Sequence, residues 1–416
     1  MIFVPGSIGA SYTYTELVPN GLDFVQAYAI NDSGAVVGSG LQGGNWKGFI
    51  YEDGAYTMPL PPGWTSAYAA FINNSGVVVG AGSDGSGTQK GFIYNSGRYT
   101  ELLPKGWTSA GAAFINDSGV VVGGGSDGSG TQKGFIYNSG RYTELLPKGW
   151  DFAYASWINN SGAVVGVGFQ GGNWKSFIYE GGAYAEPLPE GWTSAYAYFI
   201  NDSGVVVGGG SDGSGTQKGF IYSGGIYTEL LPPGWTSAYA YCINDNGVVV
   251  GGGSDGSGTQ KGFIYSGGIY TELLPPGWTS AYGTFINDSG VVIGNSMSVS
   301  DTGPIMKAFV AFPPSPQDEI ADILDFIDSA LTEGTATGNC GKVQWKSVEK
   351  MLTKAAHRIE DGKIKKACDK LDDAYDRVLK HLKSKKACVS ETAAEVADQI
   401  LDVMQDLGCK EQGCRH

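Results

Sequence analysis

Residues Phe114–Tyr137 read FINDSGVVVGGGSDGSGTQKGFIY, and this stretch decides the fold. Nearly the same string returns at Phe199–Tyr222, and again, with Cys242 in place of the phenylalanine, up to Tyr265. Short runs of valine, isoleucine and aromatic residues alternate with turns made of asparagine, aspartate, serine and glycine. Such runs are typical of β-strands, and such turns suit tight hairpins. The stretch therefore predicts consecutive antiparallel strands.

The Ile-Asn-x-x-Gly motif inside this stretch occurs seven times. It begins at Ile30, Ile72, Ile115, Ile158, Ile200, Ile243 and Ile286. Each unit offers four short strands, which is the size of one β-propeller blade. The last unit lacks a fourth strand, and Ser11–Gly21 (SYTYTELVPNG) supplies the matching one. We therefore predict an all-β seven-bladed β-propeller over residues 1–314, closed by an N-terminal strand that protects the sheet edge.

Each unit joins a stretch close to I-N-x-x-G-x-V-V-G to a later stretch that begins with lysine, K-G-F-I-Y at Lys90–Tyr94 and Lys133–Tyr137 or K-A-F-V-A-F at Lys307–Phe312. In this respect residues 11–312 resemble the HAF-type extracellular repeat, in which the second stretch begins with histidine. Lysine takes that place in all seven units, which weakens any role tied to the histidine. The resemblance implies a secreted or cell-surface propeller with no established reaction.

The hydrophobic period changes to about 3.6 residues after Ser315, which indicates helices. Ser315 and Pro316 form a helix start, and Ile320, Leu324 and Ile327 then line one face. Three more helices are expected near residues 343–361, 363–383 and 390–407. We predict a small four-helix all-α domain over residues 315–416. Through Ala330–Tyr375 it resembles the FIMAH-like helical module found after secreted repeat domains.

Five of the six cysteines lie in this small, charged domain: Cys340, Cys368, Cys388, Cys409 and Cys414. Such clustering favours disulfides in an oxidising, extracellular compartment, with the pairing open. Because five cannot pair completely, one is expected to stay free or to bond another chain, with Cys409 or Cys414 as the candidate. A zinc site of Cys409, Cys414 and His416 is the alternative, although its spacing matches no standard site. Cys242 replaces an aromatic residue of the other units and is predicted to be a buried free thiol.

Histidine usage argues against catalysis. The three histidines, His357, His381 and His416, all lie in the tail, so the propeller has no imidazole for general acid–base chemistry. The recurrent carboxylates repeat around the ring instead of gathering in one place. We therefore expect no enzyme activity, no cofactor and no metal. A calcium site in the SDGSG loops is an alternative, but each loop offers a single carboxylate.

Charge and hydropathy narrow the partners. The net charge of −14 argues against nucleic acid, and the apolar runs are too short to insert into a membrane. The N-terminal segment MIFVPGSIGA lacks the features of a signal peptide as written. The remaining partners are a protein, including other copies of the chain, or a carbohydrate.

Candidate binding residues lie on the loops of one propeller face. The exposed tryptophans expected there are Trp46 and Trp174, in the GGNWK hairpins of units one and four. They are joined by the loop aspartates Asp84, Asp127, Asp212 and Asp255. The recurrent tryptophan of the PPGWTS loops is instead expected to pack inside, and the lysine that starts each third strand to offset nearby acids.

Six asparagines begin an Asn-x-Ser sequon: Asn31, Asn73, Asn116, Asn159, Asn201 and Asn287. Glycosylation there competes with a second interpretation, in which they are hairpin turns that happen to spell the sequon.

Two functions follow from these observations. The first is an extracellular structural or interaction protein that assembles with itself through contacts between propeller and tail. The second is a lectin-like propeller that uses the tryptophans and the SDGSGTQ loops.

Overall fold

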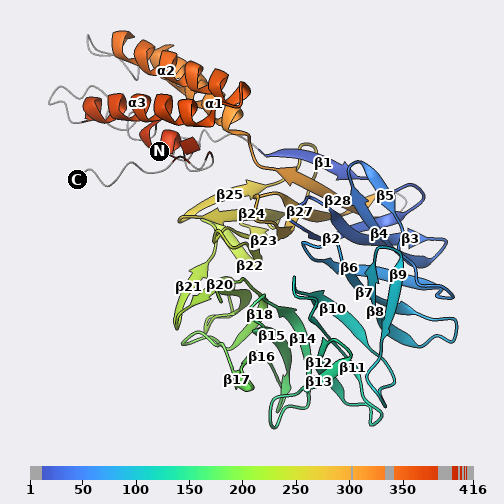
Figure 1. The fold of residues 1–416 in the computed structure, drawn as a ribbon. Coiled ribbons are helices and arrows are strands. Elements are labelled where there is room, and N and C mark those ends of the chain that lie inside the picture. Colours follow the sequence, from blue (N-terminus) through green and yellow to red (C-terminus); the bar gives the residue numbers. More distant parts are fainter. Residues whose placement is uncertain are drawn as a thin grey trace. The chain divides into compact units, whose positions relative to one another are not determined.

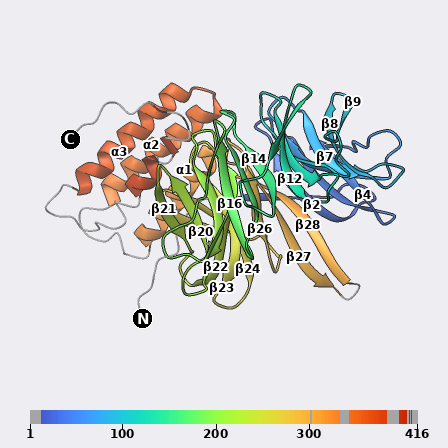
Figure 2. The ribbon, with the colours of Figure 1, turned by 90° about the horizontal axis from the view of Figure 1, so that it is seen from below.

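The computed structural model describes residues 12–300, 303–332, 342–382, 396–401, 403–404, 407 and 409. It divides into two compact units, Tyr14–Phe312 and a unit that includes Pro313–His416. The first unit contains seven four-stranded antiparallel sheets arranged around an axis (Figure 1). The seven-bladed propeller is thus confirmed. Figure 2 shows the same sheets turned by 90°.

Each blade runs from an inner strand at the axis to an outer strand at the rim. The strands of blades 1 to 3 are β2 (Asp23–Ile30), β3 (Val36–Gln42), β4 (Asn45–Glu52), β5 (Ala55–Thr57); β6 (Ser66–Ile72), β7 (Val78–Ser83), β8 (Gln89–Asn95), β9 (Arg98–Leu102); β10 (Gly111–Ile115), β11 (Val121–Ser126), β12 (Gln132–Asn138) and β13 (Arg141–Leu145). Those of blades 4 and 5 are β14 (Phe152–Ile158), β15 (Val164–Gln170), β16 (Asn173–Glu180), β17 (Ala183–Ala185); β18 (Ser194–Ile200), β19 (Val206–Ser211), β20 (Gln217–Ser223) and β21 (Ile226–Leu230).

Blade 6 is formed by β22 (Trp235–Ile243), β23 (Val249–Asp255), β24 (Gln260–Ser266) and β25 (Ile269–Leu273). Blade 7 combines β26 (Tyr282–Ile286), β27 (Val292–Ser300) and β28 (Gly303–Phe312) with the N-terminal β1 (Thr13–Leu17). Glu16 of β1 pairs with Lys307 of β28 at 3.1 Å, as the equivalent residues do in other blades. The N-terminal strand therefore closes the ring, as predicted.

Seven asparagines tie the blades together at one end of the axis. Each side chain is 4–5% exposed, and its Nδ2 donates to the backbone carbonyl of the asparagine in the next blade at 3.0–3.1 Å. Each Oδ1 accepts from the backbone N–H four residues later. The chain of bonds closes on itself, and we call it the asparagine ring: Asn31, Asn73, Asn116, Asn159, Asn201, Asn244 and Asn287.

A second closed ring follows directly in the sequence. The backbone N–H of the residue after each asparagine donates to the side-chain oxygen of its counterpart in the next blade, at 2.8–3.1 Å. Its members are Asp32, Asn74, Asp117, Asn160, Asp202, Asp245 and Asp288. Burial raises the pKa of Asp245 and Asp288, and the neighbouring carboxylates add to the shift.

Five aromatic side chains plug the axis beside the asparagine ring. Trp157 stacks between Phe114 and Phe199, with ring centroids 3.5 and 3.8 Å apart. Phe71 and Phe285 complete the group at 5.6 Å from each other. Cys242 takes the equivalent place in blade 6, is fully buried, and is a free thiol, as expected from the sequence. Burial raises the pKa of its thiol well above the usual range.

The second unit is helical, with α1 (Pro316–Thr332), α2 (Lys342–Glu360), α3 (Ile364–Leu382) and helical residues at 396–401 and 403–404. The Ser315 hydroxyl and the Asp318 carboxylate cap α1. Ile320, Val348 and Leu371 belong to its buried core, together with Val396 from the last helical stretch. The four-helix prediction is confirmed. No helix in the described ranges has the length and hydropathy that crossing a bilayer requires.

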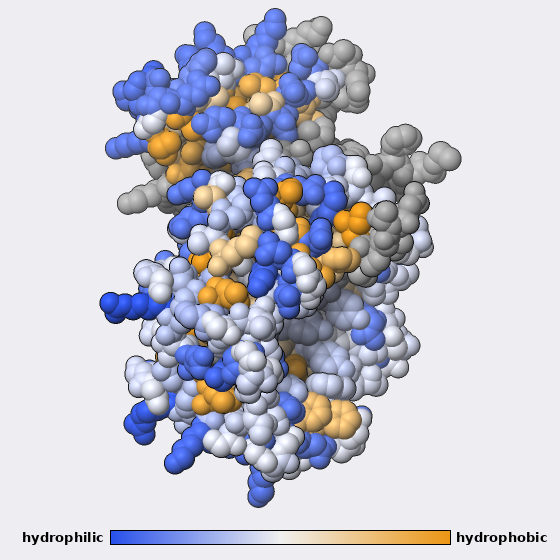
Figure 3. Space-filling view, turned by 90° about the vertical axis from the view of Figure 1, so that its right-hand side faces the viewer, coloured by the Kyte–Doolittle hydropathy of each residue, from blue (hydrophilic) through white to orange (hydrophobic). Residues whose placement is uncertain are grey.

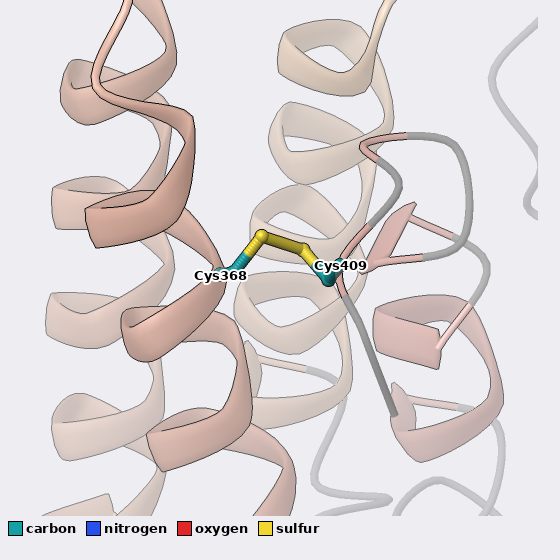
Figure 4. The surroundings of a disulfide bond; sticks show 2 residues. All are labelled: Cys368 and Cys409. Atoms are coloured by element: carbon teal, nitrogen blue, oxygen red, sulfur yellow. A yellow bond between two sulfur atoms is a disulfide. The ribbon is translucent and has the colours of Figure 1, made fainter. Parts of the chain in front are cut away.

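A disulfide joins Cys368 of α3 to Cys409 (Figure 4). Cys409 is thus neither the unpaired cysteine nor a thiolate ligand, and the zinc site that included it is wrong. Cys340, Cys388, Cys414 and His416 lie outside the described residues.

We expect Asn116→Ala to lower the free energy of unfolding by about 1–3 kcal/mol, because it leaves the Val120 N–H and the ring without a buried hydrogen-bond partner. Urea unfolding measures this loss. Ser118→Ala, which removes the sequon but none of the hydrogen bonds of the asparagine ring, serves as the control. An Asn116→Ala protein as stable as that control would contradict a structural role for the ring.

We expect reduction of the Cys368–Cys409 disulfide to destabilise the helical unit by about 4 kcal/mol, because the bond closes a chain segment of 41 residues. Thermal unfolding followed by far-UV circular dichroism, with and without reductant, measures this effect. The propeller transition is the internal control. If the helical unit unfolds at the same temperature with and without reductant, the disulfide does not stabilise it.

Candidate functional site

The SDGSGTQ loops are held by their own aspartates. In blade 2, Asp84 Oδ1 accepts from the Ser86 hydroxyl at 2.6 Å and from the backbone N–H groups of Ser86 and Thr88. Asp84 Oδ2 pairs with Lys90 at 3.1 Å. The same arrangement recurs at Asp127, Asp212 and Asp255. The visible role of these four carboxylates is therefore to shape the loop, and their role as ligand residues stays a prediction.

These contacts stabilise the charged carboxylates. The Ser86 hydroxyl is the main cause that lowers the pKa of Asp84 to about 2, and Lys90 acts in the same direction. The pKa of Asp255 is likewise lowered to about 2, chiefly by Ser257. The pKa values of Asp127 and Asp212 lie further below the usual range for the same reason.

Each loop network continues to the recurrent tryptophan. Lys90 also pairs with Glu101 at 2.9 Å, and Glu101 accepts from Trp64 Nε1 at 3.1 Å. The Trp64 ring is 6% exposed and packs edge-on against Phe92 of its own blade. Trp107, Trp150 and Trp192 are equally buried, and Trp235 and Trp278 make the same ring contact. The prediction that these tryptophans pack inside is confirmed for the first four, whereas Trp235 and Trp278 are half-buried. The pairing of the lysines with acids is confirmed except at Lys47, which donates to the Thr65 carbonyl.

The sequon asparagines are the members of the asparagine ring, except for Asn244. Their Nδ2 atoms are buried and already donate to a neighbouring blade. A glycan would replace one of these donor hydrogens and could not be accommodated beside the plug. The interpretation of the sequons as structural turns therefore explains them better than glycosylation does.

Trp46 and Trp174 are the exposed tryptophans, at 39% and 44%, as the sequence predicts. Both follow a tight turn of two glycines with positive φ, Gly43–Gly44 and Gly171–Gly172. Such a turn requires glycine-like conformations and places each tryptophan on the strand directly after it. Figure 3 shows that hydrophobic residues on one side of the propeller otherwise form small, separate groups.

The propeller axis is hollow at the end opposite the asparagine ring, next to blades 1 to 4. The cavity there has a volume of about 820 Å³. Its walls include Tyr28, Ser39, Trp46, Tyr68, Ala70, Gln89, Ser109, Gly111, Ala113, Gln132, Tyr154 and Ser156. Trp46 is thus part of a concave site, whereas Trp174 is not among its lining residues.

A β-bulge in every inner strand positions part of this wall. The ladder skips one residue just before the plug residue, as between Ala69 and Phe71, and a bulge re-aims the side chain it leaves unpaired. The bulged residues are Tyr28, Ala70, Ala113, Ser156, Tyr198, Tyr241 and Thr284. The first four of them line the cavity.

The first three repeat units recur as the next three, displaced by 128 residues, and the cavity exists because the two copies differ at this position. Blades 2 and 3 carry Ala70, Gly111 and Ala113, whereas the duplicate blades 5 and 6 carry tyrosine at each equivalent place. Those tyrosines, Tyr198, Tyr239 and Tyr241, contact one another with ring centroids 5.9 and 6.3 Å apart, so side chains occupy that half of the axis. Burial raises the pKa of Tyr241 to about 12.

The two copies also differ at the position beside Tyr239, where the second copy carries Gly209. A Cβ at Gly209 would lie 2.5 Å from the Tyr239 ring, so tyrosine there requires glycine beside it. In the duplicate, Gly111 replaces the tyrosine and Ala81 replaces the glycine. The two exchanges are opposite in size, a large residue for a small one at one position and a small residue for a larger one beside it, so they compensate sterically. The sequence difference between the two copies was the signal that could have located the cavity.

Most polar side chains of the cavity wall have no side-chain hydrogen bond within the described part of the protein. The Tyr28 hydroxyl bonds Ser39 at 2.8 Å. Within the described part of the chain, no side-chain hydrogen bond occupies the other polar groups: the Tyr68, Tyr154 and Ser156 hydroxyls, Trp46 Nε1 and the Gln89 and Gln132 carboxamides. By contrast, Gln217 of blade 5 accepts from the Tyr239 hydroxyl. None of the lining residues, all of them described, carries a charge.

No protein-family model matches the sequence. No curated protein matches it either. The HAF-type and FIMAH-like resemblances are therefore not confirmed.

Several solved structures are similar in fold. YCF48 bound to D1 peptide is 12% identical with a TM-score of 0.44, covering 73% of this chain and 96% of its own. The WD40 domain of SCAP from fission yeast is 8% identical with a TM-score of 0.39, covering 72% and 87%. The Aleuria aurantia lectin, in complex with Fucα1-6GlcNAc, is 10% identical with a TM-score of 0.35, covering 62% and 100%. At these identities the likeness concerns the propeller fold alone.

We expect the four loop aspartates to contribute to acid stability. The pKa of each carboxyl is lower in the folded protein than in the unfolded chain, where it is about 4. The carboxylates therefore stabilise the fold above about pH 4, and this stabilisation is lost as the pH falls towards 2. Changing Asp84, Asp127, Asp212 and Asp255 together to asparagine should flatten this part of the curve of unfolding midpoint against pH. Asp53→Asn, in a turn outside these loops, is the control. Parallel curves for wild type and the fourfold variant would refute the expectation.

Proposed function

We propose that the protein is a non-enzymatic, lectin-like carbohydrate-binding propeller that holds an uncharged saccharide in the axial cavity. The observation that carries the proposal is the combination, in one concave site of about 820 Å³, of aromatic rings with polar groups that have no protein partner. Binding sites for small molecules have this character, mostly apolar walls with a few convergent polar groups.

The chemistry of the wall fits a sugar. A sugar ring presents a face of C–H groups and an edge of hydroxyls. Trp46, Tyr68 and Tyr154 offer aromatic surface for the face. Gln89 and Gln132 each offer a donor and an acceptor for the hydroxyls.

The absence of charge from the described lining residues selects against ionic ligands. A carboxylate or phosphate in this cavity would lose its hydration without gaining a counter-charge, which is costly. The same wall lacks carboxylate, imidazole, amine and thiol groups, so it offers no general acid–base pair for a reaction. For these reasons the proposal is binding without catalysis, and a neutral saccharide as the ligand.

The compartment we propose is extracellular. The Cys368–Cys409 disulfide supports an oxidising environment. Self-assembly stays a prediction with less support than before, because Cys409, a candidate for an intermolecular bond, is used within the chain.

We expect Ala70→Tyr/Ala113→Tyr to abolish saccharide binding and leave the fold intact. The two tyrosines would fill the cavity, and blades 5 and 6 already accommodate Tyr198 and Tyr241 at the same positions. Isothermal titration calorimetry measures binding, against a panel of neutral mono- and disaccharides on which the wild type is first screened.

Ala70→Ser/Ala113→Ser is the matched control, since it changes the same positions but keeps the space, as Ser156 does in blade 4. It should bind as the wild type does. Thermal unfolding checks that both variants are folded. Binding by the tyrosine variant at wild-type affinity, or no binding by the wild type to any neutral saccharide, would rule out the proposed site.

A further inference from the structure

Blade 4 carries an aromatic surface beside the cavity, formed by Phe152, Phe169 and Trp174, which we call the blade-4 platform. Phe152 and Phe169 are direct partners across β14 and β15, with centroids 5.6 Å apart and planes only 2° apart. Trp174 pairs with Phe169 across β15 and β16 and meets the two rings edge-on at 5.2 and 5.8 Å. Its side chain nevertheless stays 44% exposed. The platform is therefore rigidly supported and open to solvent.

Among the described residues, the other blades have no such surface. Five of them carry serine at the place of Phe152: Ser66, Ser109, Ser194, Ser237 and Ser280. The first four of these belong to the blades whose neighbouring hairpin is SDGSGTQ. In blade 1, Trp46 pairs with Leu41 and makes no ring contact among the described residues. A group of three adjacent aromatic residues, with Trp174 exposed and Phe152 and Phe169 half-buried, in one of seven otherwise similar blades indicates a specific use.

The platform is continuous with the cavity. Phe152 contacts Tyr154 edge-on at 5.8 Å, and Tyr154 lines the cavity. Polar groups flank the platform at the hairpin tip, where Asp151 accepts from the Gly171 N–H and Asn173 donates to the Gly171 carbonyl. A ligand that leaves the cavity past Tyr154 therefore meets an aromatic face with hydrogen-bonding groups at its edge.

The axis is blocked beyond the cavity. Along the inner strands the plug residue follows directly after the bulged residue that lines the cavity, as Phe114 follows Ala113. Phe71, Phe114 and Trp157 fill the axis there, so a chain cannot pass through the propeller. A polymer that enters the cavity along the axis must therefore do so by its end.

We propose that the blade-4 platform is a second subsite, and that the ligand is a neutral oligosaccharide bound by its end. The terminal sugar occupies the cavity, and the following sugars stack on Phe152 and Trp174. This inference rests on the proposed function, which supplies the first subsite. The occupant we propose is a carbohydrate, because the platform adjoins the proposed saccharide cavity and combines aromatic rings with hydrogen-bonding groups at its edge, among them Asp151 and Asn173.

Affinity as a function of chain length tests the inference. Cello-, malto- and chito-oligosaccharides, each from the monosaccharide to the hexasaccharide, are titrated into the full-length chain by calorimetry. We expect affinity to rise about tenfold or more once the chain is long enough to reach the platform, as expected for an added aromatic anchor. Trp174→Ala should remove this gain and leave the affinity of the monosaccharide unchanged. Trp46→Ala should weaken every length, because Trp46 lines the cavity.

Trp174→Tyr keeps an aromatic ring and should restore most of the gain, which separates stacking from a loss of folding. Length-independent binding, or a gain that persists in Trp174→Ala, overturns the second subsite and leaves the cavity proposal standing. A self-associated wild type that Trp174→Ala converts to monomer, with length-independent binding, would assign the platform to a second copy and overturn the inference. No binding at any length overturns both proposals.

Discussion

The asparagine ring is the constraint on which the rest of the propeller depends. Each blade buries one carboxamide, and a buried amide is stable only if its donors and acceptors are paired. Here the carboxamide closes its own hairpin through Oδ1 and binds the next blade through Nδ2. Because the last bond runs from Asn287 to Asn31, removing any one member opens the ring. The repeat is therefore tied to a fixed number of blades.

Contacts within each blade explain why the SDGSGTQ loops on the opposite face are nearly identical. The aspartate of SDGSGTQ, the lysine of the third strand, the glutamate of the fourth and the loop tryptophan form one network within a blade, as Asp84, Lys90, Glu101 and Trp64 do. Each of these four side chains forms a hydrogen bond or ion pair with another member of the network, so replacing one of them leaves its partner unpaired. Near-identity of these loops across blades thus follows from their internal contacts, without a ligand.

Function is to be sought where the repetition ends. Blades 1 and 4 lack the SDGSGTQ loop and expose a tryptophan each, and blades 2 and 3 carry small residues at three places where blades 5 and 6 carry tyrosines. Trp46 and the small residues meet at one cavity, most of whose polar side chains have no partner among the described residues, and Trp174 lies on the platform beside it. In the duplicate half of the propeller, tyrosines occupy the axis instead.

The sequence by itself determined the seven blades, the closing strand, the helical tail, the exposure of Trp46 and Trp174 and the burial of Cys242, because these follow from periodicity, turn chemistry and position within a repeat. It could not determine that the sequon asparagines form a ring, since their partners lie one blade away. Nor could it separate Trp46 from Trp174. The small residues Ala70, Gly111 and Ala113 look in the sequence like an adjustment to the crowded axis. Only the tertiary structure, which brings four inner strands together and adds a bulge to each, converts those missing side chains into a cavity.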